Sequence, residues 1–262
     1  MKNESAVQLT NRVRKEFASL DEAKWRRRTG LFPAEGTKCV LELAAVFRPR
    51  SVYATEEWIA EHGAAIEGVE VCRVQARDLR ELTRLSSTPP VIAAFELPEA
   101  PQLPDRSYFS ENLTLMLDRV QDPGNLGTIL RTCDWMGVRN IIASEDTVDC
   151  FNPKVVQATM GGLARTKVVY TNLPALLDTL DKSVAVCGTF LDGENIYTAA
   201  LPDSGVLIMG NEGKGISDEV ANAVNRRLLI PSYPGTDKVE SLNVAVATAI
   251  ALSQFRMRLF GQ

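Results

Sequence analysis

The sequence predicts an α/β protein with a mostly parallel β-sheet in its second part. After residue 108, short apolar runs typical of strands alternate with helical stretches, which is the pattern of a parallel sheet covered by helices on both faces. The first part also mixes helical and strand-like segments, and a proline-rich stretch separates the two parts. We therefore expect a small α/β domain over residues 1–97, a linker over 98–108 and a second α/β domain over 109–262.

In the first part, the spacing of apolar residues predicts helices over residues 5–19 and 37–47. Short runs rich in β-forming residues predict strands over Ser51–Ala54, Val69–Val74 and Val91–Phe95. The segment ELPEAPQLPDRS then places three prolines within seven residues. Because proline interrupts both helices and strand ladders, this segment is predicted to be the linker.

In the second part, five apolar runs predict strands and a long stretch predicts the last helix. The predicted strands are Leu113–Leu117, Asn140–Ala143, Val184–Gly188, Val206–Met209 and Arg227–Ile230, and the predicted helix is Ser241–Leu259. In sheets of this class, ligands bind in the loops that follow the carboxyl ends of the strands. Three such loops contain unusual residues, and we expect the functional site there.

Composition and residue usage exclude several classes of protein. With 45% hydrophobic and 24% charged residues, the chain has the composition of an ordinary soluble globular protein. No apolar run approaches the roughly 18 residues of a membrane span, and the N-terminal MKNESAVQLTNRVRKEF lacks the apolar core of a signal peptide. We therefore expect a cytoplasmic protein without a membrane partner. Five scattered cysteines and one histidine, His62, argue against a disulfide framework, a metal site and histidine-based catalysis.

Positive charge is concentrated near the N-terminus, although the net charge of the chain is −4. Residues 1–40 contain nine Lys or Arg and five Asp or Glu, a local excess of 9 − 5 = +4. Within this region Lys24, Arg26, Arg27 and Arg28 surround Trp25. Such a cluster is typical of a surface that contacts phosphates, and a solvated helix end is the alternative interpretation.

The first unusual loop is QDPGNLGTILRT, residues 121–132. Pro123 and Gly124 predict a sharp turn, and Asn125 is predicted to cap the helix that follows. Arg131 lies six residues after Asn125, in an otherwise apolar stretch. A cation near a helix start is opposed by the helix dipole, so we expect a phosphate or carboxylate partner for it. The alternative is a helix start without further function.

The second unusual loop is LIMGNEGKGIS, residues 207–217. Its outer glycines, Gly210 and Gly215, have the spacing of a nucleotide-binding P-loop, but Ile216 and Ser217 stand where Lys and Ser or Thr are required. ATP or GTP binding is therefore excluded. Glycines around an Asn-Glu pair instead favour a backbone that curls around a small ligand, with Glu212 held near it.

The third unusual loop follows the predicted strand that ends at Ile230 and Pro231. Ser241 is predicted to cap the last helix. Asn243 would then lie inside the first turn of a buried helix, where it needs a partner from a ligand or from another loop.

Together, and in this order, the three loops resemble the three motifs of the SpoU/TrmH-type RNA ribose 2′-O-methyltransferases of the SPOUT superfamily. The motifs correspond to DPGNLGTILRT, GNEGKGIS and IP…ESLNVAVA, and the resemblance covers residues from about 110 to 260. The N-terminal segment RRRTGLFPAEGTKCVLEL resembles the start of the small α/β substrate-binding domain that many members carry. The resemblance implies that the C-terminal sheet forms a deep trefoil knot, a rare exception to unknotted topology.

The resemblance also implies a cofactor and roles for individual residues. The methyl donor S-adenosylmethionine would bind in the knot, with no metal. Its contacts would be Gly210, Ile230 and Leu242, with Met209 and Ser232 nearby. The residues implied as catalytic are Asn125, Arg131, Glu212, Ser241 and Asn243. Arg131 would act either as the base or as the group that binds the RNA phosphate and the developing alkoxide. Residues 231–240 form a longer loop than is common in the family, which affects the expected details of the donor pocket.

The partners implied by the resemblance are RNA and a second copy of the chain. Members with an N-terminal substrate domain more often modify ribosomal RNA, so rRNA is favoured over tRNA. Lys24, Arg26, Arg27 and Arg28 would contact the RNA backbone. The homodimer would form through the knotted domain, with the apolar stretch Val244–Leu252 in the contact. The alternatives are a tRNA enzyme, a non-catalytic RNA-binding relative and, less favoured, a dinucleotide enzyme, for which the glycine fingerprint is missing.

Overall fold

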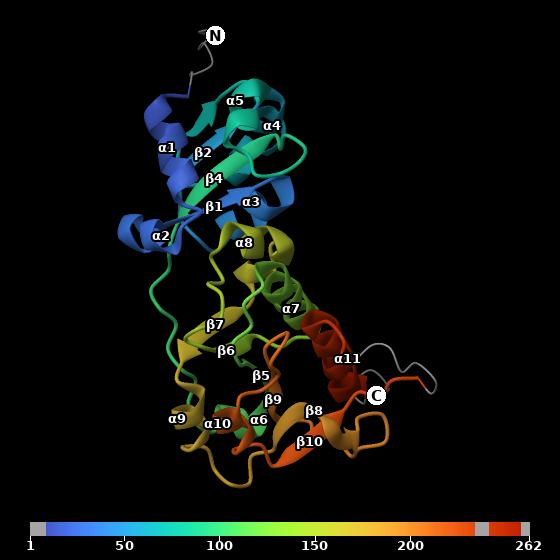
Figure 1. The fold of residues 1–262 in the computed structure, drawn as a ribbon. Coiled ribbons are helices and arrows are strands. Elements are labelled where there is room, and N and C mark those ends of the chain that lie inside the picture. The colour runs from blue at the N-terminus through green and yellow to red at the C-terminus, as the bar shows by residue number, and fades with distance from the viewer. Residues whose placement is uncertain (1–8, 234–240, 258–262) are drawn as a thin grey trace. The chain divides into compact units, whose positions relative to one another are not determined.

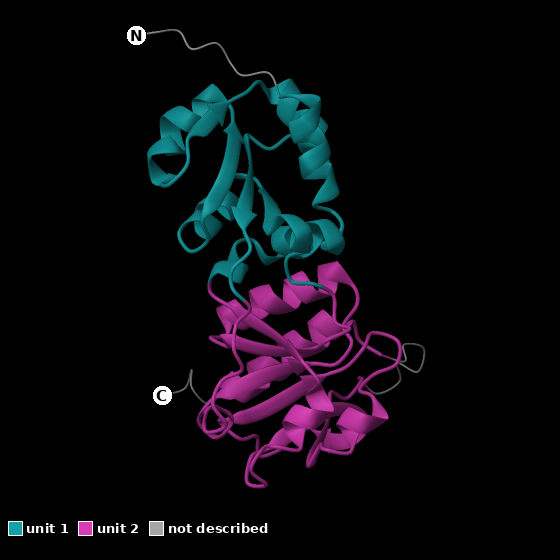
Figure 2. Cartoon of the chain, turned by 90° about the vertical axis from the view of Figure 1, so that its left-hand side faces the viewer, with its two compact units in different colours: residues 1–99, 149–164 teal, residues 100–148, 165–262 magenta. Residues whose placement is uncertain are grey.

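The computed structural model describes residues 9–233 and 241–257. The chain forms two compact α/β units (Figures 1 and 2). The first contains residues 1–99 and 149–164, and the second contains residues 100–148 and 165–262. One boundary was expected from the sequence, in the proline-rich stretch. The structure has two further boundaries between the units, because an excursion of the chain, residues 149–164, leaves the second unit and packs with the first.

The first unit is built on a four-stranded sheet in the order β1-β4-β2-β3. Its strands are β1 (Leu31–Glu35), β2 (Pro49–Ala54), β3 (Val71–Arg73) and β4 (Val91–Glu96). Strand β4 is antiparallel to β1 and β2, whereas β2 and β3 are parallel. The three strands predicted in this part are confirmed. Strand β1 was missed because Pro33 interrupts its sequence, and the structure accommodates this proline on an edge strand.

Six α-helices belong to the first unit within the described residues. They are α1 (Asn11–Ser19), α2 (Ala23–Thr29), α3 (Thr37–Ala44), α4 (Glu56–His62), α5 (Ala76–Leu82) and α8 (Pro153–Thr159). The helices predicted over residues 5–19 and 37–47 correspond to α1 and α3, and residues 5–8 lie outside the described part. Helix α8 comes from the excursion of the chain and packs against β1.

Arg26 of α2 is part of the interior of the first unit. Its side chain is 2% exposed, and its Nε and Nη2 donate to Asp149 Oδ2 at 3.1 and 2.6 Å. Its Nη1 donates to the carbonyl oxygens of Leu20 and Asp21 at 2.8 and 2.9 Å. The prediction that Arg26 contacts RNA is therefore wrong, because this guanidinium is buried and bonded within the protein. Its partner, Asp149, begins the excursion of residues 149–164.

The second unit contains a six-stranded sheet in the order β10-β8-β9-β5-β6-β7, and all its strand pairs are parallel. The strands are β5 (Leu113–Leu117), β6 (Asn140–Ser144), β7 (Lys167–Thr171), β8 (Val186–Asn195), β9 (Gly205–Met209) and β10 (Arg226–Leu229). The predicted α/β class and parallel sheet are confirmed. The short strand β7 was missed, and β8 continues seven residues beyond the predicted end at Gly188.

The helices of the second unit are α6 (Tyr108–Glu111), α7 (Pro123–Trp135), α9 (Leu173–Leu177), α10 (Asp218–Ala221) and α11 (Val244–Arg256). Helices α7 and α11 pack side by side (Figure 1). The sheet core includes Met116, Ile142 and Ile208, which are buried. In the part of the chain that the structure describes, no helix combines the length and the apolar character needed to cross a membrane.

The buried ion pair leads to a stability prediction for the first unit. Replacing Asp149 with alanine leaves the Arg26 charge buried without its carboxylate, and we expect the free energy of unfolding to fall by about 3 kcal/mol. Urea denaturation followed by circular dichroism measures this change. The matched control is Glu56→Ala, which removes an exposed partner of Arg73 and should cost less than about 1 kcal/mol. Equal effects of the two substitutions would contradict a structural role for the Arg26–Asp149 pair.

Candidate active site

Neighbouring strands bring the three unusual loops to one edge of the second sheet. Strand β5 leads into α7, β9 leads into α10, and β10 leads toward α11. In the sheet, β5 and β9 are adjacent, and only β8 separates β9 from β10. Because all these strands are parallel, their carboxyl ends lie on the same side. Loops that are about 90 residues apart in sequence, such as those carrying Asn125 and Glu212, therefore form direct contacts.

Asn125 joins all three loops through one side chain. Its Nδ2 donates to Glu212 Oε1 at 3.0 Å, and its Oδ1 accepts from Asn243 Nδ2 at 2.8 Å. The prediction that Asn125 caps α7 is wrong, because Asp122 precedes Pro123 and its Oδ1 accepts from the Asn125 backbone at 2.8 Å. This leaves the amide of Asn125 available to the other two loops.

Glu212 is the main hydrogen-bond acceptor of this network. Besides the bond from Asn125, its carboxylate accepts from the backbone N–H groups of Asp122 at 3.1 Å and Gln121 at 3.4 Å, and from Asn211 Nδ2 at 3.3 Å. Partial burial alone would raise the pKa of Glu212. The bonds from Asn125 and from backbone N–H groups, including its own, outweigh this effect, so the pKa lies below its usual value. The carboxylate is therefore held ionised and acts as an acceptor.

Hydrogen bonds between residues of the second loop fix its backbone conformation. Asn211 Oδ1 accepts from the backbones of Gly213 and Lys214, both at 3.0 Å, and the backbones of Asn211 and Gly215 pair with each other. A Cβ at Gly210 would lie 2.2 Å from the carbonyl carbon of Gly215, so only glycine fits there. The predicted curl of the backbone is thus present.

Asp118 supports the same loop and was missed in the sequence analysis. This aspartate follows β5, is 2% exposed, and accepts from the backbone N–H and the Oγ of Ser217 at 2.6 and 2.7 Å. An acidic residue directly after the mostly apolar strand LTLML was the available signal. Buried carboxylates require such hydrogen bonds, and here they bind the end of the second loop to the end of β5.

Asn243, rather than the predicted Ser241, caps the last helix. Its Oδ1 accepts from the backbones of Ala245 at 2.9 Å and Val246 at 3.3 Å, and α11 begins at Val244. Its Nδ2 is the donor to Asn125, so the expected partner of Asn243 is the first loop. Residues 234–240, which belong to the longer loop noted above, lie outside the described part.

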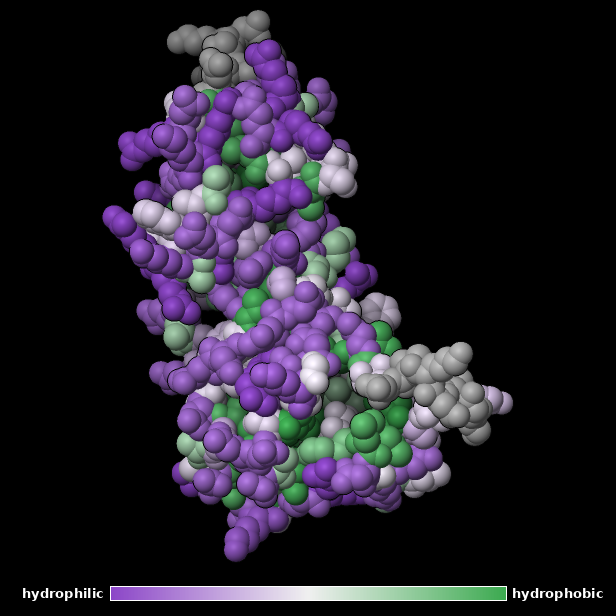
Figure 3. Space-filling model, in the orientation of Figure 1, coloured by the Kyte–Doolittle hydropathy of each residue, from purple (hydrophilic) through white to green (hydrophobic). Residues whose placement is uncertain are grey.

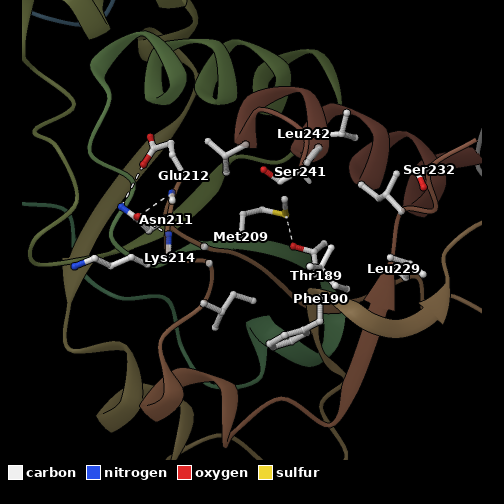
Figure 4. Close-up of a pocket in the computed structure, with 18 of the residues that line it drawn as sticks. Thr189, Phe190, Met209, Asn211, Glu212, Lys214, Leu229, Ser232, Ser241 and Leu242 are labelled. Atoms are coloured by element: carbon white, nitrogen blue, oxygen red, sulfur yellow. Dashed lines mark hydrogen bonds between the residues drawn. The ribbon is translucent and has the colours of Figure 1, made fainter. Parts of the chain in front are cut away.

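A cavity of about 940 Å³ lies next to this network (Figure 4). All five residues expected at the methyl donor line it, namely Met209, Gly210, Ile230, Ser232 and Leu242, as do Glu212 and Ser241. Figure 4 shows the contact between Thr189 and Met209 in this cavity, where Thr189 Oγ1 lies 3.8 Å from Met209 Sδ. Figure 3 shows hydrophobic side chains gathered on the face of the second unit turned to the viewer. A largely apolar cavity with a few polar groups is typical of a site for a small organic ligand.

Residues of β8 complete the cavity and were also missed. Thr189, Phe190 and Leu191 line it, although they lie in the part of β8 beyond its predicted end. No local pattern marks these three residues as binding residues. Their position depends on how β8 pairs with β10, which the sequence does not reveal.

The structure does not bring Arg131 to the cavity. Arg131 is the ninth residue of the 13-residue helix α7, so the expectation that it lies near the helix start is wrong and the dipole argument does not apply. The side chain is exposed, and it forms no hydrogen bond or ion pair with the residues that the structure describes. It is also absent from the described lining of the cavity. Any partner for this guanidinium must therefore come from outside the described residues of the chain.

The remaining basic residues predicted to contact RNA lie at the surface of the first unit. Lys24, Arg27 and Arg28 of α2 are exposed, and the guanidinium of Arg28 lies 4.8 Å from the ring centroid of Trp25. Across residues 9–233 and 241–257, no group of three or more His, Cys, Asp or Glu side chains is arranged to hold a metal ion.

Comparisons with known proteins agree with this architecture. The family described as SpoU rRNA Methylase matches residues 112–253, and a family described as MRM3-like substrate binding domain matches residues 11–93. The 23S rRNA (guanosine(2553)-2′-O)-methyltransferase RlmP of Bacillus subtilis is 32% identical over 253 residues, which cover 94% of this chain and 96% of that protein.

Solved structures are similar to this protein over nearly the whole chain, as the following two show. A putative RNA methyltransferase of the TrmH family from Porphyromonas gingivalis has a TM-score of 0.83 and 38% identity, covering 96% of this chain and 100% of the other. An AdoMet-bound rRNA methyltransferase from Sinorhizobium meliloti has a TM-score of 0.82 and 31% identity, covering 97% and 98%.

The lowered pKa of Glu212 predicts how its contribution to stability depends on pH. A carboxyl group whose pKa is lower in the folded state stabilises the protein above its unfolded pKa, and this contribution disappears as the pH falls through the folded pKa. Glu212→Gln should lower the free energy of unfolding by about 1 kcal/mol at pH 7, and the difference from the wild type should shrink below about pH 4.

Urea titrations at several pH values between neutral and about 3.5 measure this difference. The control is Glu219→Gln, an exposed carboxylate in the first turn of α10. A difference between wild type and Glu212→Gln that is the same at all pH values would contradict an ionised hydrogen-bond acceptor.

Proposed function

Because the chain belongs to the SpoU rRNA methylase family, we propose that its cavity binds S-adenosylmethionine and that it methylates a ribose 2′-hydroxyl of ribosomal RNA. The observation that carries this proposal is the meeting of the three motif loops. Asn125, Glu212 and Asn243 bond to one another, and Glu212 also lines the cavity. A polar network thus borders an apolar cavity. This arrangement suits transfer of a sulfonium methyl to a sugar hydroxyl, in which the sulfur keeps the electron pair of the broken S–C bond and the hydroxyl loses its proton.

The residues of the cavity fit the methyl donor. The volume of about 940 Å³ is at the upper end of the range for organic ligands. Met209, Ile230 and Leu242 supply apolar surface, and the missing side chain of Gly210 lets the backbone approach a ligand. A bound S-adenosylmethionine supplies an activated sulfonium methyl, so the protein needs to align the acceptor oxygen and help to remove its proton.

We propose that the polar network orients the acceptor ribose. Glu212 is ionised and its oxygens accept from several donors, so it fixes the positions of Asn125 and of the first turn of α7. Ser241, an exposed residue of the cavity lining, is available to the ribose or the donor. Because a guanidinium stays protonated in proteins, Arg131 is assigned to the phosphate next to the acceptor and to the developing alkoxide.

This role for Arg131 requires a second copy of the chain. Arg131 lies outside the described cavity lining of its own chain, so we propose that it serves the cavity of the partner in a homodimer. Trp135, four residues later on the same helix face, is 85% exposed, and Val246 on the adjacent helix α11 is 49% exposed. Large exposed apolar side chains on two packed helices are typical of a protein contact.

The exposed face of α11 is narrower than the stretch predicted from the sequence. Within Val244–Leu252, Val244, Ala245, Thr248, Ala251 and Leu252 are buried in the chain's own core. We therefore propose that Val246 and the half-buried residues beside it, together with Trp135, form the contact with the partner.

Two findings favour rRNA over tRNA as the substrate. The name of the Bacillus subtilis relative specifies 23S rRNA, and that relative matches both parts of this chain. The first unit matches a substrate binding domain, and its exposed Lys24, Arg27 and Arg28 are suited to the RNA backbone. We keep the cytoplasm as the proposed location, since an rRNA enzyme acts where ribosomes are assembled. A tRNA substrate and a non-catalytic RNA-binding role are the outcomes that the following experiment separates.

Methyl transfer by purified protein tests the function and the role of Arg131. With labelled S-adenosylmethionine, the wild type should methylate ribose in rRNA and not in tRNA, and mapping of the 2′-O-methyl group should identify the nucleotide. Arg131→Ala should reduce turnover by about 100-fold or more, while calorimetry finds donor affinity within about twofold of the wild type.

The control for this experiment is Arg139→Ala, which removes another exposed arginine of the second unit and should leave turnover unchanged. Normal turnover of Arg131→Ala would remove Arg131 from the reaction. Transfer to tRNA alone would favour the tRNA alternative, and donor binding without transfer to either RNA would favour the non-catalytic one.

Charge reversal on α2 tests the RNA-binding surface. Arg27→Glu with Arg28→Glu should weaken RNA binding about tenfold near 0.1 M salt. The slope of the logarithm of the RNA binding constant against the logarithm of the salt concentration should also become less steep. The change should be about 0.7–0.9 for each RNA phosphate that the variant no longer neutralises. Filter binding at several salt concentrations measures both. Arg77→Glu with Arg80→Glu reverses two exposed arginines elsewhere in the first unit. If both pairs weaken RNA binding equally, the α2 surface has no special role.

Sedimentation tests the dimer contact. The chain has a mass of 28.7 kDa, so the wild type should sediment as a species of about 57 kDa, twice that value. Trp135→Glu should place a charge in the contact and give a species of 28.7 kDa with little methyl transfer. Val46→Asp, at an exposed position of the first unit, should remain dimeric. A monomeric wild type with full activity would contradict the shared site.

A further inference from the structure

We propose that Arg227 is a positioning residue that holds Phe190 as one wall of the methyl donor cavity. This inference rests on the proposed function of that cavity. The guanidinium carbon of Arg227 lies 3.5 Å from the centroid of the Phe190 ring, and Phe190 lines the cavity. Arg227 itself is not among the described lining residues, so its effect on the donor would pass through Phe190.

The need for such a residue follows from the pairing of β8 with β10. Arg227 pairs with Gly188, but the next residue, Leu228, pairs with Glu194. Residues 189–193 of β8, here called the β8 bulge, therefore have no pairing partner on β10. A strand segment that leaves its ladder loses the hydrogen bonds that would fix its side chains. The β8 bulge nevertheless supplies Thr189, Phe190 and Leu191 to the cavity.

Arg227 stands where the β8 bulge leaves the ladder, and its side chain binds the bulge at two points. Besides covering the ring of Phe190, it donates to Asp192 Oδ1 from Nη2 at 2.6 Å and from Nε at 3.1 Å. These bonds lower the pKa of Asp192, which keeps its carboxylate ionised. One planar guanidinium thus contacts an aromatic face and a carboxylate of the same bulge, a geometry that lysine cannot reproduce.

At Gly188, which precedes the β8 bulge, and at Gly193, its last residue, the backbone lies in close contact with neighbouring residues. A Cβ at Gly188 would lie 2.7 Å from Phe190 Cε2, so the ring packs directly on the backbone there. A Cβ at Gly193 would lie 2.4 Å from the Leu228 carbonyl carbon, so the far end of the bulge is also in backbone contact. The ring is half-buried between Gly188 and Arg227 and borders the cavity. It offers the donor a rigid apolar and aromatic surface suited to an adenine ring or an aliphatic chain.

The neighbouring residue Arg226 provides a matched control. It lies on the same strand and also pairs with a carboxylate of β8, with Nη2 3.4 Å from Glu194 Oε2. Its Nη1 donates to the carbonyl oxygen of Ala200 at 2.7 Å. Neither Glu194 nor Ala200 lines the cavity. Loss of Arg226 therefore removes a comparable ion pair between β10 and β8 without touching the cavity wall.

Calorimetric titration of the full chain with S-adenosylmethionine tests the proposal, together with the KM for the donor and kcat. Phe190→Ala should raise the donor Kd about tenfold, and Arg227→Ala about fivefold, by increasing KM for the donor more than it lowers kcat. Arg226→Ala should stay within about twofold of the wild type. Because Arg227 acts through Phe190, the double variant should bind the donor no more weakly than Phe190→Ala alone.

Several outcomes would overturn the proposal. One is that Arg227→Ala binds the donor as tightly as Arg226→Ala does. Another is that the losses of donor affinity caused by Arg227→Ala and Phe190→Ala add up in the double variant. If Arg227→Ala does not fold, Arg227→Lys and Phe190→Leu decide the question. Arg227→Lys keeps the positive charge and Phe190→Leu keeps apolar bulk, and both remove the stacking of a guanidinium on an aromatic ring. A wild type that binds no donor would instead refute the proposed function of the cavity. A wild type that binds the donor while all these variants match it would refute the roles of Arg227 and Phe190 but not the proposed function of the cavity.

Discussion

The side chain of Asn125 donates to Glu212 and accepts from Asn243, and the geometry of the cavity depends on these two bonds. The three residues come from loops after three different strands, so no single loop can form the site alone. Glu212 makes the arrangement stable because its ionised carboxylate also accepts from the backbone at the start of α7. The same contacts that hold the loops together therefore orient the groups that we assign to the acceptor ribose.

The backbone around this network allows little variation. Gly210 has no room for a Cβ, and the buried carboxylate of Asp118 binds the end of the second loop to β5. Rigid support from strands and hydrogen-bonded loops suits methyl transfer, which requires the sulfonium methyl and the acceptor oxygen to be aligned within a narrow range. The β8 bulge, which forms another wall of the cavity, is not held by strand pairing with β10. Its position depends instead on side-chain contacts such as that between Arg227 and Phe190.

Arginines in this chain serve different purposes in spite of similar sequence contexts. Arg26 and Arg27 are neighbours in one basic cluster, yet Arg26 is buried against Asp149 and Arg27 is exposed. Arg226 and Arg227 are neighbours on one strand, yet only Arg227 covers an aromatic ring of the cavity. Arg131 is exposed and bonds to none of the described residues. We therefore assign Arg131 to an RNA phosphate as a proposal, whereas the guanidinium of Arg26 is bonded within the first unit.

Local sequence determined the α/β class, most strands of both sheets and the identity of the three motif loops, because apolar periodicity, glycine and proline act over a few residues. It also indicated that Asn243 needs a partner. The sequence offered more than one candidate cap for each helix, and the residue that caps is the one directly before the first helical residue. Asp122 therefore caps α7 in place of Asn125, and Asn243 caps α11 in place of Ser241. Only the tertiary structure decided that Arg26 is buried and that the β8 bulge borders the cavity. Both depend on contacts between segments far apart in sequence, namely residues 149–164 with α2 and β10 with β8, and no local pattern encodes such pairings.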